Sequence, residues 1–191
     1  MATRIVITGT LGPKEDAKAI AWLAQSVADE RPDEIVCTEG SVTLLDRLQE
    51  VFDGPIGVHG GIFETRHEVT ALPAVYEIAP GWVSVRDGGD IKLSRIAGNT
   101  ALNAAKRLGA SVVLGHTGRM GIGSYTSGYG GNGKVVTGME VGNLADMRMV
   151  KGSDAGTAWQ QGFGILTVDG QHVTPEGVAR SLRRSYSKRE V

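Results

Sequence analysis

The 191-residue chain has little of several residue types that build common kinds of site. Its single cysteine, Cys37, excludes an internal disulfide and any zinc cluster built on several thiolates. Only 4 histidines are present, so a metal site would depend on these and on carboxylates. No apolar run reaches the roughly 18 to 20 residues of a membrane span, and residues 1–12 lack the charged-then-apolar pattern of a signal peptide. We therefore expect a soluble intracellular protein.

Neither sign of charge is in excess, because 20 Lys and Arg stand against 21 Asp and Glu. With 41% hydrophobic residues, the chain suits one single-core domain, which we place at residues 1–178 with a basic tail at 179–191. Glycine is abundant instead, with 28 residues, at about twice its usual share. This abundance indicates many positions that need a positive φ or that other groups approach closely.

Strand, turn and helix alternate in the N-terminal third. Short β-branched runs predict buried strands at residues 4–8, 34–38 and 56–59. Apolar residues at three- and four-residue spacing predict one helix from Pro13 in its first turn to Arg31, and a second helix capped by Ser41. Strands joined by such helices imply right-handed crossovers and a mainly parallel sheet.

The pattern is less regular further along. Residues 60–80 predict a loop or a short helix, residues 82–86 a strand, residues 99–108 a helix closed by Gly109, and residues 111–114 another buried strand. Residues 134–142 and 163–168 alternate like antiparallel strands, so we expect a mixed sheet. The glycine-rich segment 115–133 has no assignment.

Ligands of parallel α/β sheets gather where strands end and loops begin. Four such loops are predicted, at residues 9–12, 39–40, 59–64 and 116–121. These loops are where we expect a functional site.

Several long phrases of the chain match one family in order. The chain resembles the calcineurin-like metallophosphoesterases, and most closely the group encoded by phages of actinobacteria. This resemblance implies an α/β fold, a metallophosphoesterase-like mixed β-sheet sandwich flanked by helices. It rests on residues 31–36, 54–59, 79–83, 96–106, 113–117, 139–146 and 159–175.

The resemblance also implies a two-metal centre, whose cations polarise a phosphate and activate a bridging water. In the family, the metal ligands and a catalytic histidine follow the strands in Asp-x-His, Gly-Asp, Gly-Asn-His-Asp and Gly-His-x-His motifs. Here most of those positions hold residues without ligand atoms, and the later histidine corresponds to Arg86, while His116 remains. The vacated positions are Gly9, Leu11, Gly40, Ile62, Phe63 and Gly118.

A dication needs several oxygen or imidazole ligands, so we expect a catalytically inactive protein with no cofactor. One alternative is an active phosphoesterase with one rebuilt divalent site, such as Mn or Zn, at His59, Glu64, Glu39 and His116. Another is phosphate or nucleotide binding without turnover, in which Arg86 and strand-end glycine amides attract the anion.

Three other features have simpler interpretations. Residues 128–134 have P-loop spacing, but Val135 replaces the hydroxyl residue that should hold Mg²⁺, which favours a glycine-rich hairpin or loop. Residues 8–12 match a dinucleotide-binding turn only weakly, because Pro13 follows them and the third glycine of that motif is missing. Cys37 is predicted to be a small buried residue and not a reactive thiol.

Binding is therefore the expected role. The resemblance to phage proteins favours a protein partner, which would be a virion component, a host factor or another copy of the chain. It also implies the cytoplasm of the host bacterium, or the virion, as the location. We expect no membrane association, and nucleic acid remains an alternative partner through the basic tail.

Overall fold

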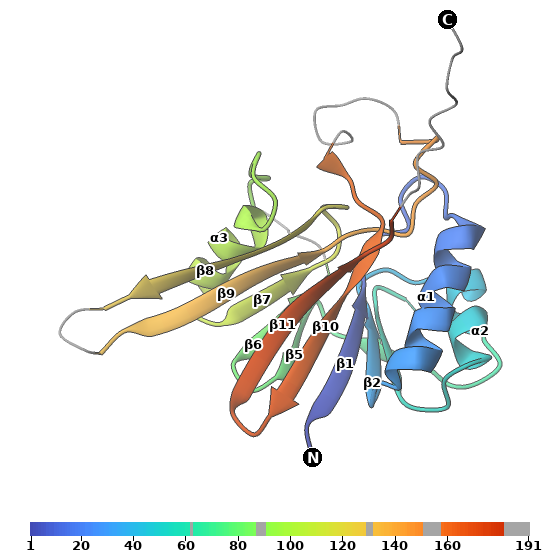
Figure 1. Cartoon of the computed structure of the whole chain (residues 1–191), viewed down its shortest axis with the longest axis horizontal. Helices are drawn as coiled ribbons and strands as arrows, with labels where there is room; N and C mark the ends of the chain where they lie inside the picture. The colour runs from blue at the N-terminus through green and yellow to red at the C-terminus, as the bar shows by residue number, and fades with distance from the viewer. Residues whose placement is uncertain (62, 87–90, 129–131, 151–157, 182–191) are drawn as a thin grey trace, which may run out of the picture.

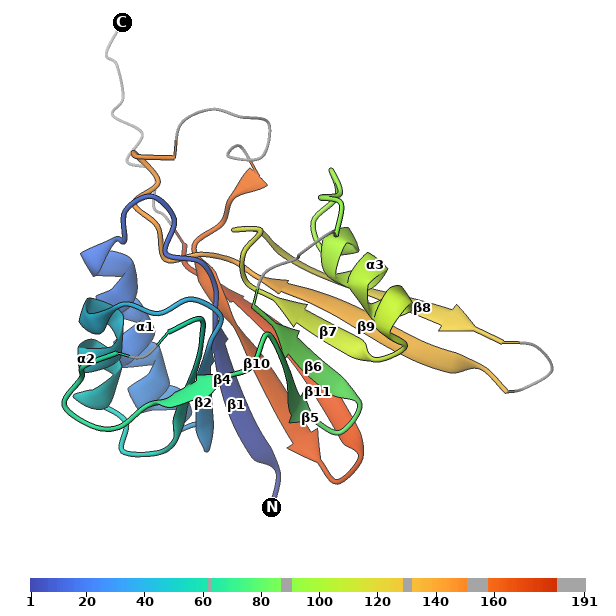
Figure 2. The same cartoon turned by 180° about the vertical axis from the view of Figure 1, so that it is seen from behind.

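The computed structural model describes residues 1–61, 63–86, 91–128, 132–150 and 158–181. Two mixed β-sheets lie face to face, with two helices on the outer face of one sheet and a third on the outer face of the other (Figures 1 and 2). This arrangement confirms the predicted α/β sandwich. None of the helices in the described ranges combines the length and apolar character needed to cross a membrane.

The first sheet has the strand order β11-β10-β1-β2-β3-β4. Strands β1 to β4 are parallel, β10 is antiparallel to β1, and β11 is antiparallel to β10. Its strands are β1 (Thr3–Thr8), β2 (Glu34–Cys37), β3 (Ile56–His59), β4 (Thr70–Leu72), β10 (Gly162–Asp169) and β11 (His172–Ala179).

The second sheet has the order β5-β6-β7-β9-β8, in which β6, β7 and β9 are parallel and the outer strands β5 and β8 are antiparallel to their neighbours. Its strands are β5 (Val75–Ala79), β6 (Trp82–Val85), β7 (Ser111–Leu114), β8 (Met120–Ser127) and β9 (Lys134–Val141).

Local signals set the ends of the helices. In α1 (Ala17–Glu30) the Asp16 carboxylate accepts a hydrogen bond from the Lys18 amide, and Ser41 caps α2 (Val42–Gln49) by accepting one from the Leu44 amide. The third helix, α3 (Asn99–Leu108), ends at Gly109 in the left-handed conformation, as predicted.

The predicted start of α1 at Pro13 is wrong. Asp16 is the capping residue, and the Ile20 amide donates the first helical hydrogen bond to the Asp16 carbonyl at 2.9 Å. The capping carboxylate therefore places the first turn of the helix after Pro13.

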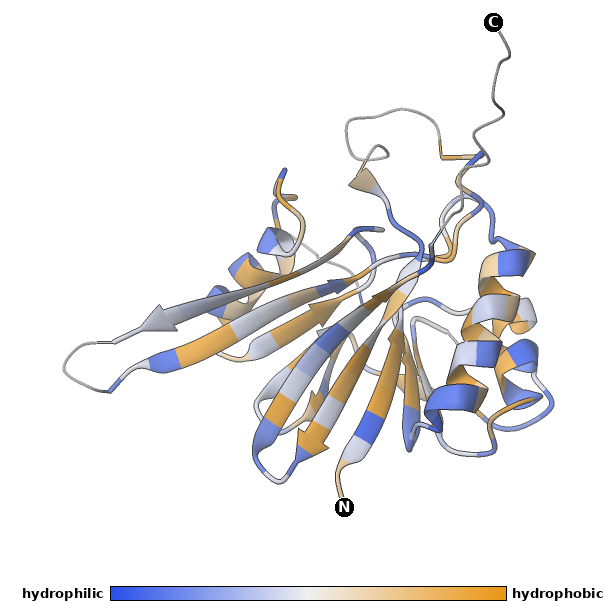
Figure 3. Ribbon diagram, viewed as in Figure 1, coloured by the Kyte–Doolittle hydropathy of each residue, from blue (hydrophilic) through white to orange (hydrophobic). Residues whose placement is uncertain are grey.

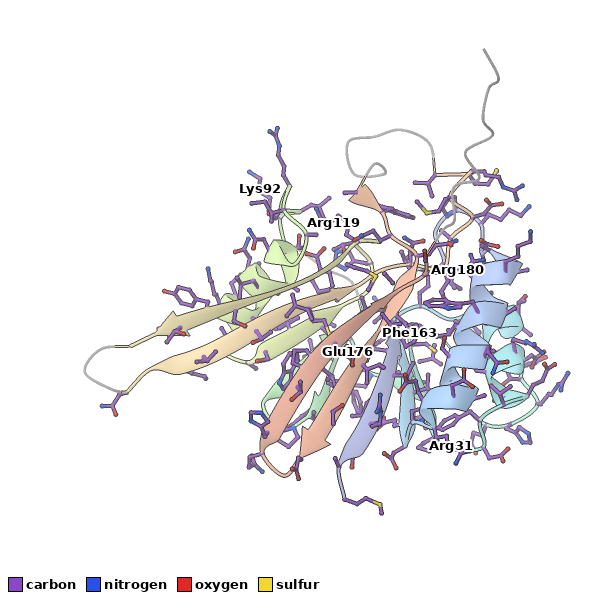
Figure 4. All side chains as sticks on the ribbon, in the orientation of Figure 1. Arg31, Lys92, Arg119, Phe163, Glu176 and Arg180 are labelled. Carbon is purple, nitrogen blue, oxygen red and sulfur yellow. The ribbon has the colours of Figure 1, made fainter. Side chains whose placement is uncertain are left out.

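Apolar side chains fill three layers. One lies between the first sheet and α1 and α2, one between the two sheets, and one between the second sheet and α3. Figure 3 shows the corresponding apolar bands on the strands of both sheets. In the first layer, the centroid of the Phe163 ring of β10 lies 5.3 Å from the centroid of the Trp22 ring of α1. Figure 4 shows Phe163 beside that helix.

One segment differs from the prediction, and one segment without an assignment is a strand. Residues 60–80, predicted as a loop or short helix, contain β4 and β5, which are edge strands with many exposed residues and therefore show no clear apolar alternation. Residues 120–127, which had no assignment, form β8, which pairs antiparallel with β9. Lys134 begins β9, so no helix follows this segment as a P-loop would require, and residues 129–131 lie outside the described residues. In the predicted tail, Ala179 ends β11, and residues 182–191 lie outside the described residues.

Candidate functional site

A cavity of about 440 Å³ opens where the carboxyl ends of strands from both sheets meet. Segments that follow β2, β3, β6 and β7 line it, so three of the four predicted loops converge here, as expected for parallel strands. The lining residues are Thr38, Glu39, Gly40, His59, Gly60, Phe63, Arg86 and His116.

Glu39 joins the fourth predicted loop to this cavity. Its Oε2 atom accepts hydrogen bonds from the Thr10 hydroxyl at 2.5 Å and from the Leu11 amide at 3.0 Å. The Thr10 amide in turn donates to the carbonyl of Gly115 at 3.1 Å, next to His116. One oxygen of the Glu39 carboxylate therefore holds the loop after β1 against the loop after β2, and the Thr10 amide joins the loop after β1 to the loop after β7.

His59 ends β3 and is only 2% exposed. Its Nε2 atom shares a hydrogen bond of 2.6 Å with the Ser84 hydroxyl of β6, so the ring bridges the two sheets. Burial lowers the pKa of His59 below its ordinary value, and the nearby Arg86 charge lowers it further, against an opposing contribution from the Pro73 carbonyl. The imidazole is therefore neutral at pH 7.

Arg86 provides a fixed positive charge at the rim of the cavity. Its side chain runs over Gly60, where a Cβ atom would lie 3.1 Å from the Arg86 Cδ atom. Gly60 also has a φ of +87°, which L side chains rarely adopt, so glycine suits this position on both counts. Half-buried His116 lines the same cavity.

Gly40 has no room for a side chain. A Cβ atom there would lie 2.6 Å from Cγ1 of Val58 and 3.1 Å from the ring of Phe63. Val58 is fully buried, and Phe63 packs against the core layer beneath it. Two apolar side chains thus occupy the space that a carboxylate at position 40 would need.

Gly9 and Gly118 are equally enclosed. A Cβ atom on Gly9 would lie 1.9 Å from the carbonyl oxygen of Gly142, and one on Gly118 would lie 2.5 Å from the ring of Trp159. Leu11 is 5% exposed and belongs to the core layer under α1 and α2. Ile62 lies outside the described residues.

The proposed substitute ligands do not all meet. Glu39, His59 and His116 line the cavity, whereas Glu64 is exposed and does not. Within the described ranges, no three His, Cys, Asp or Glu side chains come together in a group that could hold a metal ion. Cys37 is fully buried, as predicted, and burial raises the pKa of its thiol to about 11, which disfavours the reactive thiolate.

The sequence analysis missed a buried ionic cluster beside His116. Arg119 and Glu140 are 2% and 1% exposed, and the Arg119 guanidinium lies 3.1 Å from a carboxylate oxygen of Glu140. Thr117 donates to the same carboxylate at 2.9 Å, and so does the amide of Thr100 at 3.0 Å. Figure 4 shows Arg119 where the loop after β7 approaches α3. The sequence offered one signal for this cluster, which is a charged residue, Glu140, between the apolar residues Met139 and Val141 of a predicted strand.

A second cavity, of about 550 Å³, lies at the N-terminus of α1. Two ion pairs lie in its lining, in which Arg180 contacts Asp16 at 3.3 Å and Arg148 contacts Asp146 at 2.7 Å. Figure 4 shows Arg180 near the upper end of α1. Four basic and three acidic side chains line this cavity, so its charges largely offset one another.

Comparisons with known proteins agree with this fold. No protein-family model matches the chain. The Gene 54 proteins of Mycobacterium phages D29 and L5 are each 35% identical to it over an alignment of 232 residues, which covers 90% of this chain and 91% of each relative.

Solved structures of Vps29 are similar in fold. A single mutant of Vps29 from Entamoeba histolytica aligns with a TM-score of 0.51 at 15% identity, covering 94% of this chain and 100% of that one. Vps29 from Chaetomium thermophilum aligns with a TM-score of 0.50 at 11% identity, covering 93% and 97%. The fold is thus metallophosphoesterase-like. By identity and coverage, the chain belongs to the family of the mycobacteriophage Gene 54 proteins.

Proposed function

We propose that this phage-family protein is a catalytically inactive metallophosphoesterase-like protein that serves as a binding or structural component. The observation that carries the proposal is the close packing around Gly9, Gly40 and Gly118. From the sequence, we expect these three positions to correspond to metal ligands of the metallophosphoesterases that the chain resembles. Neighbouring groups occupy the space that a ligand side chain would need at each of them.

This packing argues for a site that has been rebuilt without metals. An aspartate at position 40 would have to displace Val58 and Phe63, and one at position 9 would collide with the backbone at Gly142. Backbone atoms move less readily than the end of a flexible side chain, and native cores leave few voids into which they could move. A single reversion would therefore not restore a ligand.

The remaining groups do not supply the ligand set of a two-metal centre. Two dications need several anionic or imidazole ligands, and only His116 persists from the family's ligand set. The Arg86 guanidinium beside the cavity repels a metal ion. One oxygen of the Glu39 carboxylate already accepts hydrogen bonds from the Thr10 hydroxyl and the Leu11 amide.

A protein partner fits this role best. The relatives are phage proteins, so the proposed partners are a virion component, a host factor or a second copy of the chain, met in the host cytoplasm or in the virion. Nucleic acid contact through the basic residues after position 179 remains a lesser alternative, and residues 182–191 of that segment lie outside the described residues.

The shared cavity supports a second candidate function, which is phosphate or nucleotide binding without turnover. Arg86 and His116 both line it, and a phosphate group accepts hydrogen bonds from such donors. The Thr38 hydroxyl does not contribute, because it donates to the carbonyl of Thr8 at 2.9 Å. Arg86 supplies the positive charge, since His59 is neutral at pH 7.

Hydrolysis of bis(4-nitrophenyl) phosphate by the purified full chain, with and without added Mn²⁺, tests the proposal. We expect no metal-dependent turnover above that of buffer with the same metal. Metal-dependent turnover that disappears in His116→Ala but persists in His172→Ala would overturn it, because His172 is exposed on β11 outside the cavity. A rise in melting temperature with inorganic phosphate or AMP, without turnover, supports the second candidate.

A further inference from the structure

Among the described residues, the two sheets have four edge strands, and three of these carry features that discourage pairing with another chain. β4 is only three residues long, β5 carries Glu77 and an irregular register next to it, and β11 carries Pro175 and Glu176. Short length, charge, proline and bulges are the usual protections of an exposed edge. These three edges are therefore poor templates for an added strand.

β8 lacks each of these protections. It is eight residues long, contains no charged residue and no proline, and pairs with β9 on one side only. Residues 124 to 127 of this strand are exposed. Figures 1 and 2 show β8 along the outside of a two-stranded arm that extends away from the first sheet, and Figure 3 shows little strong hydropathy of either sign along it.

The backbone of β8 is open to a new partner. Across the described ranges, no backbone hydrogen bond links residues 120–127 to any segment other than β9. Along an antiparallel edge, alternate residues direct their N–H and C=O groups outward. Ser124 has a small, exposed side chain that leaves another backbone room to approach, whereas Gly121 and Gly123 pack against residues 97–98 and Leu102 of the same chain.

A second copy of the chain fits this edge. Because β8 carries no charge, two antiparallel copies place no like charges opposite each other. A two-fold axis brings the same strand of both copies together, so the edge has to be compatible with itself. An edge without charged residues meets this requirement. The pairing register puts Ile122 and Val135 on the same face of the arm, and they are 45% and 59% exposed, so apolar surface is available beside the new strand pair.

We propose that two copies of this protein associate through antiparallel pairing of their β8 strands, which extends the second sheet across a two-fold axis. This deepens the proposed binding role, on which it rests, by naming one partner. It does not depend on the absence of catalysis, which the hydrolysis assay tests separately. A single strand pair buries less surface than a standard stable interface of about 1,200 to 2,000 Å², so the dimer is weak and concentration-dependent.

Sedimentation equilibrium of the full chain, from micromolar to millimolar concentration, tests this proposal. We expect a monomer–dimer equilibrium in which Ser124→Lys raises the dissociation constant by about tenfold, because it places like charges on facing strands. The matched control is Thr174→Lys, which adds the same charge to the protected edge β11 and leaves the constant unchanged. Circular dichroism checks that each variant folds, and Thr126→Lys replaces Ser124→Lys if that variant does not.

Three outcomes overturn the proposal. The first is a monomer at every concentration. The second is a dimer that the β8 lysine does not weaken, which would place the interface elsewhere. The third is a dimer that Thr174→Lys weakens equally, which would indicate a general effect of charge.

Discussion

At Gly40 the absence of a side chain is required by packing and not by backbone conformation. Its φ lies outside the left-handed region, so any L residue could adopt its backbone. The obstacle is Val58, whose Cγ1 atom would lie 2.6 Å from an added Cβ atom. A methyl group is therefore enough to disturb the wall of the cavity.

Gly40→Ala should lower the free energy of unfolding by about 1 to 3 kcal/mol, the usual cost of overpacking a core. In urea denaturation, Gly40→Ala combined with Val58→Ala should cost less than the sum of the two single variants, because the second change makes room for the first. The matched control is Gly123→Ala, whose Cβ atom would make only ordinary contacts with Leu102 and Asn99. Strictly additive costs would show that Val58 is not the obstacle.

Among the elements, the buried Arg119–Glu140 pair links the loop after β7, strand β9 and the start of α3. Arg119 also donates to the Ser94 carbonyl at 2.6 Å and to the Thr100 hydroxyl at 2.9 Å. Each charged group therefore has several partners, as buried charges require. The cluster holds His116 and the loop that carries it against the second sheet.

Arg119→Met should lower the free energy of unfolding by about 3 to 5 kcal/mol, because it leaves the Glu140 carboxylate buried without a cation. Adding Glu140→Gln should recover part of this loss, since the neutral amide costs less to bury. The comparison variant is Arg66→Met, whose side chain is 59% exposed and pairs at 3.5 Å with Glu50, itself accessible to solvent, and which should unfold like the parent. If Glu140→Gln brings no recovery in urea denaturation, the loss comes from packing and not from the unpaired charge.

Across the whole molecule, the predictable parts are those with a regular local pattern. The β-branched runs before Gly9 and Gly60 and the capping residue Ser41 correctly located β1, β3 and α2. β4 and β5 were missed because exposed edge strands carry no alternating apolar signal. Their strand character comes from backbone pairing, of β4 with β3 and of β5 with the next strand β6, and not from an apolar pattern of their own.

The candidate site was predictable only in its location. Because parallel strands end at one edge of a sheet, the loops holding Glu39, His59 and His116 were expected to converge, and they do. The contact of Glu39 with Thr10 and the closeness of Gly9 to Gly142 join residues distant in sequence, so no local pattern encodes them. The glycine excess predicted close approaches in general, and the fold determines which groups approach.

The most direct test of the central claim is the number of Mn²⁺ ions bound per chain, measured by equilibrium dialysis of the purified full-length protein. If the ligand positions are closed by packing, as we propose, no metal binds stoichiometrically, and His116→Ala behaves like the parent. Saturable binding of two ions per chain, or of a single ion that is lost in His116→Ala, would contradict the account.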